Sequence, residues 1–517
     1  MPNNSPGWND ATCVTARQAL FAGQFEHVLT LCDALAEGES HTVEADLLRC
    51  RAYIALGQAE RALAIVRELH APYRDVDTSL TVRMLEGAAL ARLSRVDAAI
   101  DVLSSAHEEA QHAHPTVRAE IAVHLGAALY RRGRYDRAMA LLEAIPSSTD
   151  ILRARATVFE AWIAVERGDF QHAIELFRQA LREINDARHY DRFVESTAIY
   201  GLAYTCAESG RLEVWPELRG RAQRFDWSVR GVALPQFHLA IASSYLTEMR
   251  GDFDDAERWA SRAQAVAPGP AQEIIALTRL AALTGRYGES RAHSHFVHTA
   301  LRIYDAVGPD ALTRDDLGVL LSLAEELVQG RNPADALALL TFHREAMASR
   351  IERTKEHAPL AAAEQLVHAF LDDAQGRTAR AYARYEDAFQ RYDRMGYRRR
   401  AAICAYRMSL HRPDGAHRSY LAEFVAPLHA GHWLRERIAV HGVRDIRLSD
   451  RQTAILRLVA EGKSNKEIAS QRGGSWYTAR NVVRELIALF GVRTRSDLVR
   501  VATARGLLAA EQDDAAS

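Results

Sequence analysis

Glycine and proline are scarce in this sequence, and it has no long apolar runs. The 517 residues include 29 glycines and 14 prolines. Because these two residues interrupt helices most strongly, their scarcity beside abundant Ala, Leu, Arg and Glu indicates helices throughout the chain. No window approaches 18 consecutive apolar residues, which excludes a membrane-spanning helix, so we expect no membrane partner.

Cysteine is rare as well, and the positions of the cysteines argue against both disulfide bonds and a zinc site. The five cysteines are Cys13, Cys32, Cys50, Cys206 and Cys404. They are odd in number and never spaced as C-x-x-C, so neither a disulfide framework nor a zinc cluster is expected. The first residues, MPNNSPGWND, lack the basic start and apolar core of a signal peptide. We therefore expect a soluble, cytoplasmic protein.

The chain also lacks a large excess of either charge. It has 65 Lys and Arg against 67 Asp and Glu, a formal net charge of −2. This balance excludes a uniformly basic nucleic-acid coat, although it leaves local patches open. The length exceeds that of one ordinary globular core and predicts two or more domains.

What the sequence does contain is a repeat: an Ala-rich apolar helix, a short turn, and a second helix with Ala near its start. Clear copies are AYIALGQAERALAIV at 52–66, AALYRRGRYDRAMALL at 127–142 and AWIAVERGDFQHAIELF at 161–177. Successive turns lie 34 to 46 residues apart, and 34 is the period of a two-helix tetratricopeptide (TPR) unit. The expected turn positions are Gly23, Gly57, Ser94, Gly133, Gly168, Gly210, Gly251, Gly285, Gly330 and Gly376.

Residues 10–408 resemble tetratricopeptide repeats, most clearly between 52 and 260. Small residues beside the turns, such as Ala62, Ala138 and Ala173, would let paired helices approach closely. Ten turn signals in register argue against a generic Ala-rich bundle. We expect residues 1–408 to form an α-solenoid whose concave face binds a peptide, a small ligand or a protein partner.

After residue 408 the repeat stops. The segment 409–444 contains Pro427 and Gly431 and predicts one or two joining helices. From 445 to 510 there are twelve Lys or Arg and six Asp or Glu, a local balance of +6. A small basic module beside an acidic remainder favours contact with a polyanion.

Residues 445–517 predict four short helices. Ser449 with Gln452, and Ser464 with Glu467, form two capping boxes that begin the first and second helices. Gly462 would end the first helix. A Gly473-Gly474 turn would precede a third helix capped by Ser475 and ending at Gly491, with Ser496 capping a fourth. Two short helices joined by a tight glycine turn are typical of a helix-turn-helix domain.

The stretches RLSDRQTAILRLVAEGKSNKEIA (447–469) and FGVRTRSDLVRVA (490–502) closely resemble the LuxR-type DNA-binding domain of bacterial transcription factors. The resemblance implies that the third helix enters the major groove, where Arg pairs with guanine and Asn with adenine. The N-terminus of the second helix would face phosphates. It also implies a homodimer on two half-sites and makes RNA polymerase a candidate partner. The candidate DNA-binding residues are Ser464, Asn465, Lys466, Trp476, Tyr477, Thr478, Arg480, Asn481, Arg484, Arg493 and Arg495.

Each of these arginines has an alternative interpretation as part of a solvated helix face, and Arg495 can be structural. Three departures from the family pattern favour a different class of protein. Arg472 and Gly474 replace apolar residues, which would loosen the packing between the second and third helices, and Leu489 replaces a lysine. The alternative is a TPR adaptor or scaffold whose degenerate helix-turn-helix serves a protein contact.

No catalytic or cofactor motif accompanies these segments, so we expect no enzyme and no cofactor. Gly462-Lys463-Ser464 lacks the glycine that a phosphate-binding loop needs five residues earlier. The H-x-H-x-x-H of His293, His295 and His298 has no supporting carboxylate cluster, so we expect no metal site there.

Two further groups of residues receive structural interpretations. Arg398 to Arg400 are interpreted as a solvated helix face. The aromatics Trp162, Tyr200, Tyr204 and Tyr245 are interpreted as repeat core rather than a ligand cage. Taken together, the sequence predicts an all-α regulator with a TPR-like solenoid followed by a LuxR-type helix-turn-helix.

Overall fold

The computed structural model describes residues 11–508 apart from 38–41, 70–74, 94, 188–190, 213, 225–232, 309–316, 351–357, 413–416, 430, 442–447, 491, 493 and 505–507. Within this part of the chain every regular element is a helix, and none is both long and apolar enough to cross a membrane. The chain divides into two compact units, Met1–Cys404 and Ala405–Ser517. The all-α prediction is therefore confirmed.

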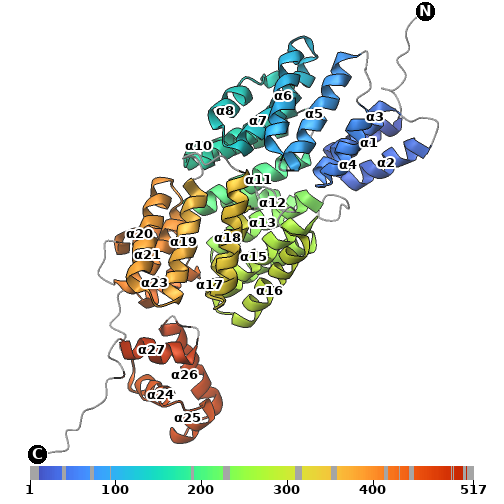
Figure 1. The fold of residues 1–517 in the computed structure, drawn as a ribbon. Coiled ribbons are helices and arrows are strands. Elements are labelled where there is room, and N and C mark those ends of the chain that lie inside the picture. The colour runs from blue at the N-terminus through green and yellow to red at the C-terminus, as the bar shows by residue number, and fades with distance from the viewer. Residues whose placement is uncertain are drawn as a thin grey trace, which may run out of the picture. The chain divides into compact units, whose positions relative to one another are not determined.

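The first unit is a TPR-like solenoid of consecutive helix–turn–helix pairs (Figure 1). The pairs are α1 (Ala11–Phe21) with α2 (Phe25–Glu37), α3 (Val43–Ala55) with α4 (Ala59–Glu68), α5 (Val76–Arg92) with α6 (Val96–Glu109), α7 (Pro115–Arg132) with α8 (Tyr135–Glu143), α9 (Ile151–Glu166) with α10 (Phe170–Asp186), α11 (Arg192–Ser209) with α12 (Trp215–Arg224), α13 (Ala233–Met249) with α14 (Phe253–Ala265), α15 (Pro270–Tyr287) with α16 (Ser290–Val307), α17 (Leu317–Gln329) with α18 (Pro333–Arg350), and α19 (Ala358–Ala374) with α20 (Thr378–Arg394). Helix α21 (Arg398–His411) follows and runs across the boundary between the units.

Most of the expected turn glycines adopt the left-handed backbone that reverses the chain. Gly133, at φ 82°, is representative: its N–H bonds the Tyr130 carbonyl, and the N–H of Arg134 bonds the Leu129 carbonyl, both at 2.9 Å. This is the Schellman pattern, which satisfies the last carbonyls of the first helix.

Two of the expected turn positions are wrong. The turn after α15 is made by Gly288 at φ 92°, and Gly285 lies inside that helix against His293. The turn after α17 is made by Arg331 at φ 66°, one residue beyond Gly330. The expected turn at Ser94 lies outside the described residues.

Small residues set how closely the helices of the solenoid approach. The predicted small positions Ala62, Ala138 and Ala173 are fully buried. Gly87 and Gly126 serve the same purpose from the first helix of a pair. A Cβ on Gly87 would lie 2.4 Å from Leu103, and one on Gly126 would lie 2.6 Å from a Leu142 methyl, so neither position has room for a side chain.

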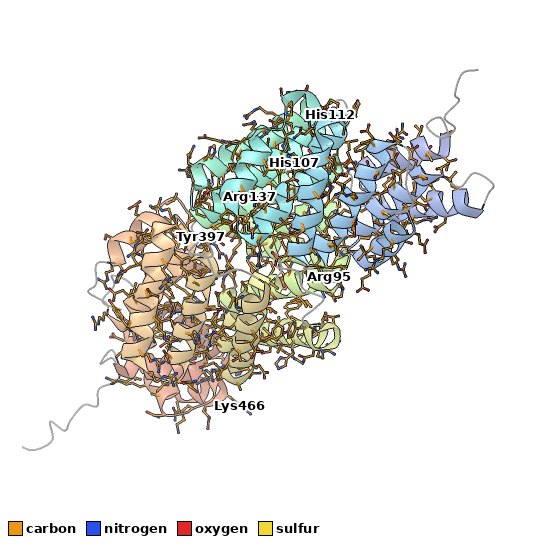
Figure 2. The ribbon with its side chains drawn as sticks, turned by 45° about the horizontal axis from the view of Figure 1, so that its top comes forward. Arg95, His107, His112, Arg137, Tyr397 and Lys466 are labelled. Carbon is orange, nitrogen blue, oxygen red and sulfur yellow. The ribbon has the colours of Figure 1, made fainter. Side chains whose placement is uncertain are left out.

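The solenoid curls so tightly that it meets itself. Phe25 of α2 contacts Phe193 of α11, with ring centroids 6.4 Å apart, and Phe170 of α10 packs edge-on against Tyr397 at 4.8 Å. Figure 2 labels Tyr397 where the orange helices approach the teal ones. Gly168 lies in the same contact, and a Cβ there would be 2.6 Å from the Met395 carbonyl oxygen.

Two arginines of α21 strengthen this closure, which corrects the interpretation of Arg398 to Arg400 as a solvated face. Arg399 is buried and bonds Glu208 of α11, 191 residues away. Arg400 donates to Glu325 of α17 at 2.6 Å. Their charges therefore hold α21 against the inner helices instead of facing water.

The second unit contains two joining helices and a four-helix group. The helices are α22 (His417–Val425), α23 (Trp433–His441), α24 (Asp450–Ala460), α25 (Asn465–Gln471), α26 (Trp476–Leu489) and α27 (Arg495–Ala504). Pro427 and Gly431 lie between α22 and α23, as expected. The last four helices share one apolar core, in which Leu456, Ile468, Leu486, Phe490 and Leu498 are fully buried.

The closing contact predicts a difference between two glycine substitutions. Gly168→Ala and Gly376→Ala impose the same backbone strain, since both glycines have φ near 75°, but only Gly168 faces another chain segment. We expect Gly168→Ala to lower the free energy of unfolding by roughly 1–3 kcal/mol more than Gly376→Ala, measured by urea denaturation of the full chain. Equal losses would mean that the closure contributes nothing to stability.

Candidate DNA interface and solenoid cavity

Capping interactions build the helix-turn-helix region as the sequence predicts. The Ser449 hydroxyl accepts from the Gln452 N–H at 3.2 Å, and the Ser464 hydroxyl accepts from the Glu467 N–H at 3.3 Å. In both boxes the third-position side chain accepts in return from the backbone N–H of the capping serine. The hydrogen bonds with Ser464 lower the pKa of the Glu467 carboxyl. Helices α24 and α25 therefore begin at the expected serines.

The turn between α25 and α26 is held by backbone bonding. Gly473 has φ 62°, and the Gly474 N–H donates to the Ala469 carbonyl at 3.0 Å. Ser475 then caps α26, because its hydroxyl accepts from the Thr478 N–H at 3.1 Å. Four apolar residues on one face of α26 and just beyond its end are buried: Ala479, Val483, Leu486 and Phe490.

The cap of the fourth helix differs from expectation. Thr494, not Ser496, caps α27: its hydroxyl accepts from the Asp497 N–H at 3.0 Å and donates to the Asp497 carboxylate at 2.7 Å. Thr494 followed three residues later by Asp497 is also a capping signal, and Thr494 lies two residues before Ser496 in the sequence.

Helix α26 presents a mixed aromatic and basic face to solvent. Trp476 is 50% exposed and Tyr477 is 65% exposed. The guanidinium of Arg480 lies over the Trp476 ring, 5.3 Å from its centroid. Arg480 and Arg484 are both exposed, while Thr478 and Asn481 are half-buried. The exposed face thus combines ring surface with two cations, a combination suited to a phosphate-lined groove.

The other candidate DNA-binding residues lie around the start of α25. Ser464 and Lys466 are exposed, and Figure 2 labels Lys466. Asn465 is half-buried, and Arg495 donates to its side-chain oxygen at 2.7 Å and also to the Lys463 carbonyl. Arg495 therefore ties α27 to the beginning of α25. Arg493 lies outside the described residues.

Two of the three departures from the LuxR pattern lie outside the shared core. Arg472 and Gly474 are exposed, and a Cβ on Gly474 would meet no atom within 4 Å. The expected loosening between the second and third helices stays a prediction. Leu489 packs against the shared apolar core.

In the solenoid unit, a cavity of about 2280 Å³ follows the inner face. Most of its lining comes from the first helix of each pair, from α1 to α19, and from α21. Trp162, Tyr200, Tyr204 and Tyr245 are among the lining residues, and they are half-buried. Their interpretation as repeat core is therefore incomplete: Trp162, Tyr200 and Tyr245 pack against buried apolar residues on one side, yet all four face the cavity.

Many of the charged side chains in the C-terminal half of this cavity form ion pairs. Glu248 accepts from Arg279 at 2.6 Å and from Arg286 at 2.5 Å, and the Arg279 guanidinium also stacks 4.1 Å over the Tyr245 ring. The His293 ring nitrogen lies 3.0 Å from the Glu326 carboxylate. The Glu248 bonds join α13 to α15, and the His293 contact joins α16 to α17, so these interactions hold the wall together.

The histidine motif does not assemble in space. His293 is buried against Glu326, whereas His295 and His298 are exposed. Among the residues that the structure describes, no group of three or more His, Cys, Asp or Glu side chains is arranged to hold a metal ion.

The N-terminal half of the cavity differs, because arginines face two neutral histidines there. Burial and, to a smaller extent, the charge of Arg92 together lower the pKa of His238 to about 4. Burial also brings the pKa of His124 to about 4; Glu120 opposes this effect, while Arg155 and other arginines add to it. Both rings therefore stay uncharged at neutral pH in a positive environment.

Arg92 and Arg131 are functional candidates that the sequence motifs did not predict, although their positions in the repeat carry a signal. Arg92 and Arg131 each lie in the last turn of the first helix of a pair, two residues before the expected turns at Ser94 and Gly133. A cation at the same repeat position in consecutive units would have indicated neighbours on one wall.

Comparison with known proteins identifies one domain. Residues 447–502 match the family model described as bacterial regulatory proteins, luxR family. The chain therefore carries a LuxR-family domain in these residues, as the sequence motifs predicted. The comparison with curated proteins found no match.

Solved helical structures give distant likenesses. A Rap protein complexed with competence and sporulation factor is 12% identical, with a TM-score of 0.41, covering 80% of this chain and 98% of that one. The apo form of RapI is 12% identical with a TM-score of 0.33, covering 74% and 97%. The Cut9–Hcn1 hetero-tetramer gives 12% identity and a TM-score of 0.38, covering 94% and 95%. Scores this low support no statement about function.

The bonds of Arg495 predict that its loss unfolds part of the helix-turn-helix. We expect Arg495→Ala to destabilise α25 and α27 by about 1–2 kcal/mol, since it removes charge-assisted bonds to Asn465 and Lys463. Hydrogen exchange of the backbone amides in these helices measures the effect. The control is Arg484→Ala, which removes an exposed arginine of α26 and should leave exchange unchanged; equal protection in both variants would contradict a structural role for Arg495.

The two cavity histidines predict a loss of stability on mild acidification. Their folded pKa values of about 4 lie below the ordinary 6.5, so the unfolded chain binds more protons between these values. Stability should therefore fall as the pH drops from 7 to 5. Replacing His124 and His238 with Gln should flatten this dependence in urea titrations, whereas His112→Gln, at an exposed position, should not. An unchanged slope in the double variant would refute the assignment.

Proposed function

We propose that the protein is a bacterial DNA-binding transcriptional regulator. In this proposal the LuxR-family domain binds promoter DNA, and the TPR-like solenoid binds a guest that controls promoter binding. The proposal places the protein in the cytoplasm and gives it no catalytic role. A homodimer reading two half-sites is part of it, and RNA polymerase is a candidate partner.

The observation that carries the DNA-binding part is the exposed face of α26 within a LuxR-family domain. Arg480 and Arg484 lie on the solvent side of the helix, while the opposite side fills the core. A helix with this division can enter the major groove without disturbing the domain. The exposed Ser464 and Lys466 at the start of α25 add donors for the DNA backbone. Thr478 would bind a phosphate, and Asn481 would read adenine.

The guest part rests on the cavity. Its volume of about 2280 Å³ exceeds the roughly 300–1,000 Å³ of ordinary small-molecule pockets. The lining comes from many helices of one curled wall, so a guest that contacts several of them would favour one curvature of the solenoid. Such differential contact is what a ligand needs in order to shift a conformational equilibrium.

The second candidate function is a TPR adaptor whose helix-turn-helix contacts protein. The observation that favours it is the exposure of Trp476 and Tyr477, since large aromatic side chains on a surface are typical of protein interfaces. The departures at Arg472 and Gly474 no longer support it, because both residues lie outside the core.

Two arginine pairs separate the candidates. We expect Arg480→Ala with Arg484→Ala to weaken promoter binding by about 1–3 kcal/mol for each base that the removed side chains would read, measured by fluorescence anisotropy with the purified full-length protein. The control pair, Arg418→Ala with Arg457→Ala, removes the same charge from exposed positions on α22 and α24 and should keep most of the affinity. The DNA fragments come from a genome-wide selection with the same protein at two salt concentrations.

A sequence motif that persists at the higher salt, with weaker binding only in the α26 pair, would support the regulator. Two copies of the motif one helical turn apart would support a dimer. Binding that disappears with salt, shows no motif and is equally sensitive to both pairs would be non-specific attraction to phosphates and would contradict the proposal.

A further inference from the structure

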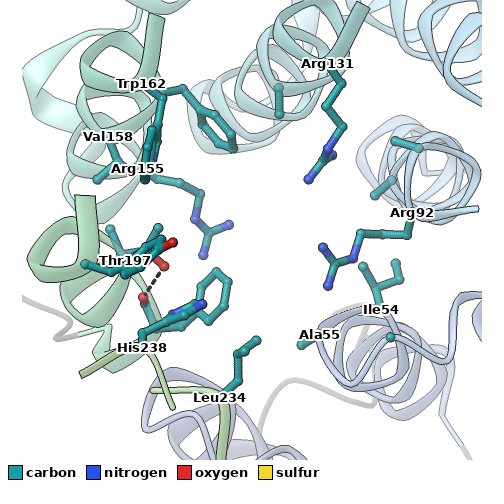
Figure 3. Close-up of a pocket in the computed structure, with 18 of the residues that line it drawn as sticks. Ile54, Ala55, Arg92, Arg131, Arg155, Val158, Trp162, Thr197, Leu234 and His238 are labelled. Carbon is teal, nitrogen blue, oxygen red and sulfur yellow. Dashed lines mark hydrogen bonds between the residues drawn. The ribbon is translucent and has the colours of Figure 1, made fainter. Parts of the chain in front are cut away.

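Three arginine side chains from consecutive pairs converge on one space in the N-terminal half of the cavity. Figure 3 shows Arg92 of α5, Arg131 of α7 and Arg155 of α9 extending their guanidinium groups toward the same open region. A guanidinium stays charged and offers a planar fork of donors. The space therefore presents several donors and positive charge from different helices.

The facing wall is apolar and aromatic. Trp162 of α9 lies 6.0 Å from Tyr200 of α11, centroid to centroid, and Tyr200 stacks on His238 of α13 at 5.6 Å with an interplanar angle of 16°. Val158 and Leu234 also line the cavity, and Leu234 points into the space (Figure 3). Flat rings held in this way offer a surface for another planar group.

Carboxylates of the protein bind two arginines of this region and fix their position. Arg155 donates to the buried Asp191 at 2.9 Å, and Arg51 bonds Glu120. The arginines around Glu120 bring the pKa of its carboxyl to about 2 against the effect of burial. The buried Nε of Arg155 has no hydrogen-bond partner. Arg155 is thus held rigidly while one of its donors remains unused.

We propose that this space is a binding site for a small ligand that carries a carboxylate joined to a planar apolar ring. The carboxylate lies among Arg92, Arg131 and Arg155, and the ring lies against Trp162 and Tyr200. A carboxylate matches the donor fork of arginine in geometry and charge, and a ring that leaves water for the aromatic wall adds apolar contact.

The site brings together two features of this part of the cavity. Three guanidinium groups, from α5, α7 and α9, point into one space. Trp162 and His238 lie across this space from Arg92 and Arg131 (Figure 3), and Tyr200 contacts both of these aromatic side chains. This ligand would be the guest of the proposed function. The effect of binding on promoter DNA rests on that proposed function, whereas binding itself does not.

The test uses paired probes that differ in one charge. Indole-3-acetate and its neutral amide represent a free aromatic acid. The dipeptide Ala-Trp with a free or an amidated C-terminus represents the end of a peptide. Isothermal titration calorimetry with the purified full-length protein measures binding, and saturation-transfer NMR reports which probe protons lie against the protein.

We expect the acid of at least one pair to bind and its amide to bind at least tenfold more weakly, with the strongest saturation on the ring protons. Which pair binds distinguishes a free acid from a peptide end. Arg92→Ala with Arg131→Ala should weaken the acid by about tenfold or more, since charge-assisted bonds are removed. Arg137→Ala, an exposed arginine on α8 outside the cavity lining, is the control and should change nothing.

Absence of binding by both acids, equal binding of acid and amide, or an unchanged affinity in the Arg92 and Arg131 variant would overturn the site. Anisotropy with promoter DNA, with and without the bound acid, separates this inference from the proposed function. If the acid binds as described and DNA affinity stays the same, the site stands and the regulatory link fails. If DNA binding is abolished only in the α26 variant while the acid still binds, the two functions reside in separate units.

Discussion

The close approach of paired helices at small residues is the constraint on which the rest of the solenoid depends. Where Gly87 and Gly126 meet leucines of the next helix, the contact distance is set by backbone against side chain. Buried alanines such as Ala62, Ala138 and Ala173 recur at the corresponding contacts of other pairs, and small rotations from pair to pair accumulate into a tight curl. The curl places α2 against α11 and α10 against the segment that begins α21, and it produces an enclosed inner face.

Within that face, charge has two uses that the surrounding atoms distinguish. Toward the C-terminal end, Arg279, Arg286 and Arg400 bond carboxylates on neighbouring inner helices. Toward the N-terminal end, the guanidinium groups of Arg92 and Arg131 point into the cavity, across from Trp162 and His238. The first arrangement holds inner helices together, and the second places donors where the carboxylate of a ligand can reach them.

Local signals in the sequence predicted the local structure well. The capping boxes at Ser449 and Ser464 and most turn glycines act over four or five residues, so they can be read without knowing the fold. The predictions that failed concern residues whose surroundings come from distant parts of the sequence. Arg399 resembled a surface residue because its partner, Glu208, is 191 positions away, and Gly474 resembled a core position because its exposure depends on how α25 meets α26. The convergence of Arg92, Arg131 and Arg155 likewise required the curl of the solenoid.

The self-contact of the solenoid also fixes an order of events in folding. The helix pairs join residues close in sequence and can form early, whereas the meeting of Phe170 with Tyr397 must close a very long loop. That closure comes late, since the intervening pairs must first adopt their curvature. The contact between distant parts of the unit therefore depends on the curvature that all the intervening pairs adopt, although each of their hairpins is a local structure.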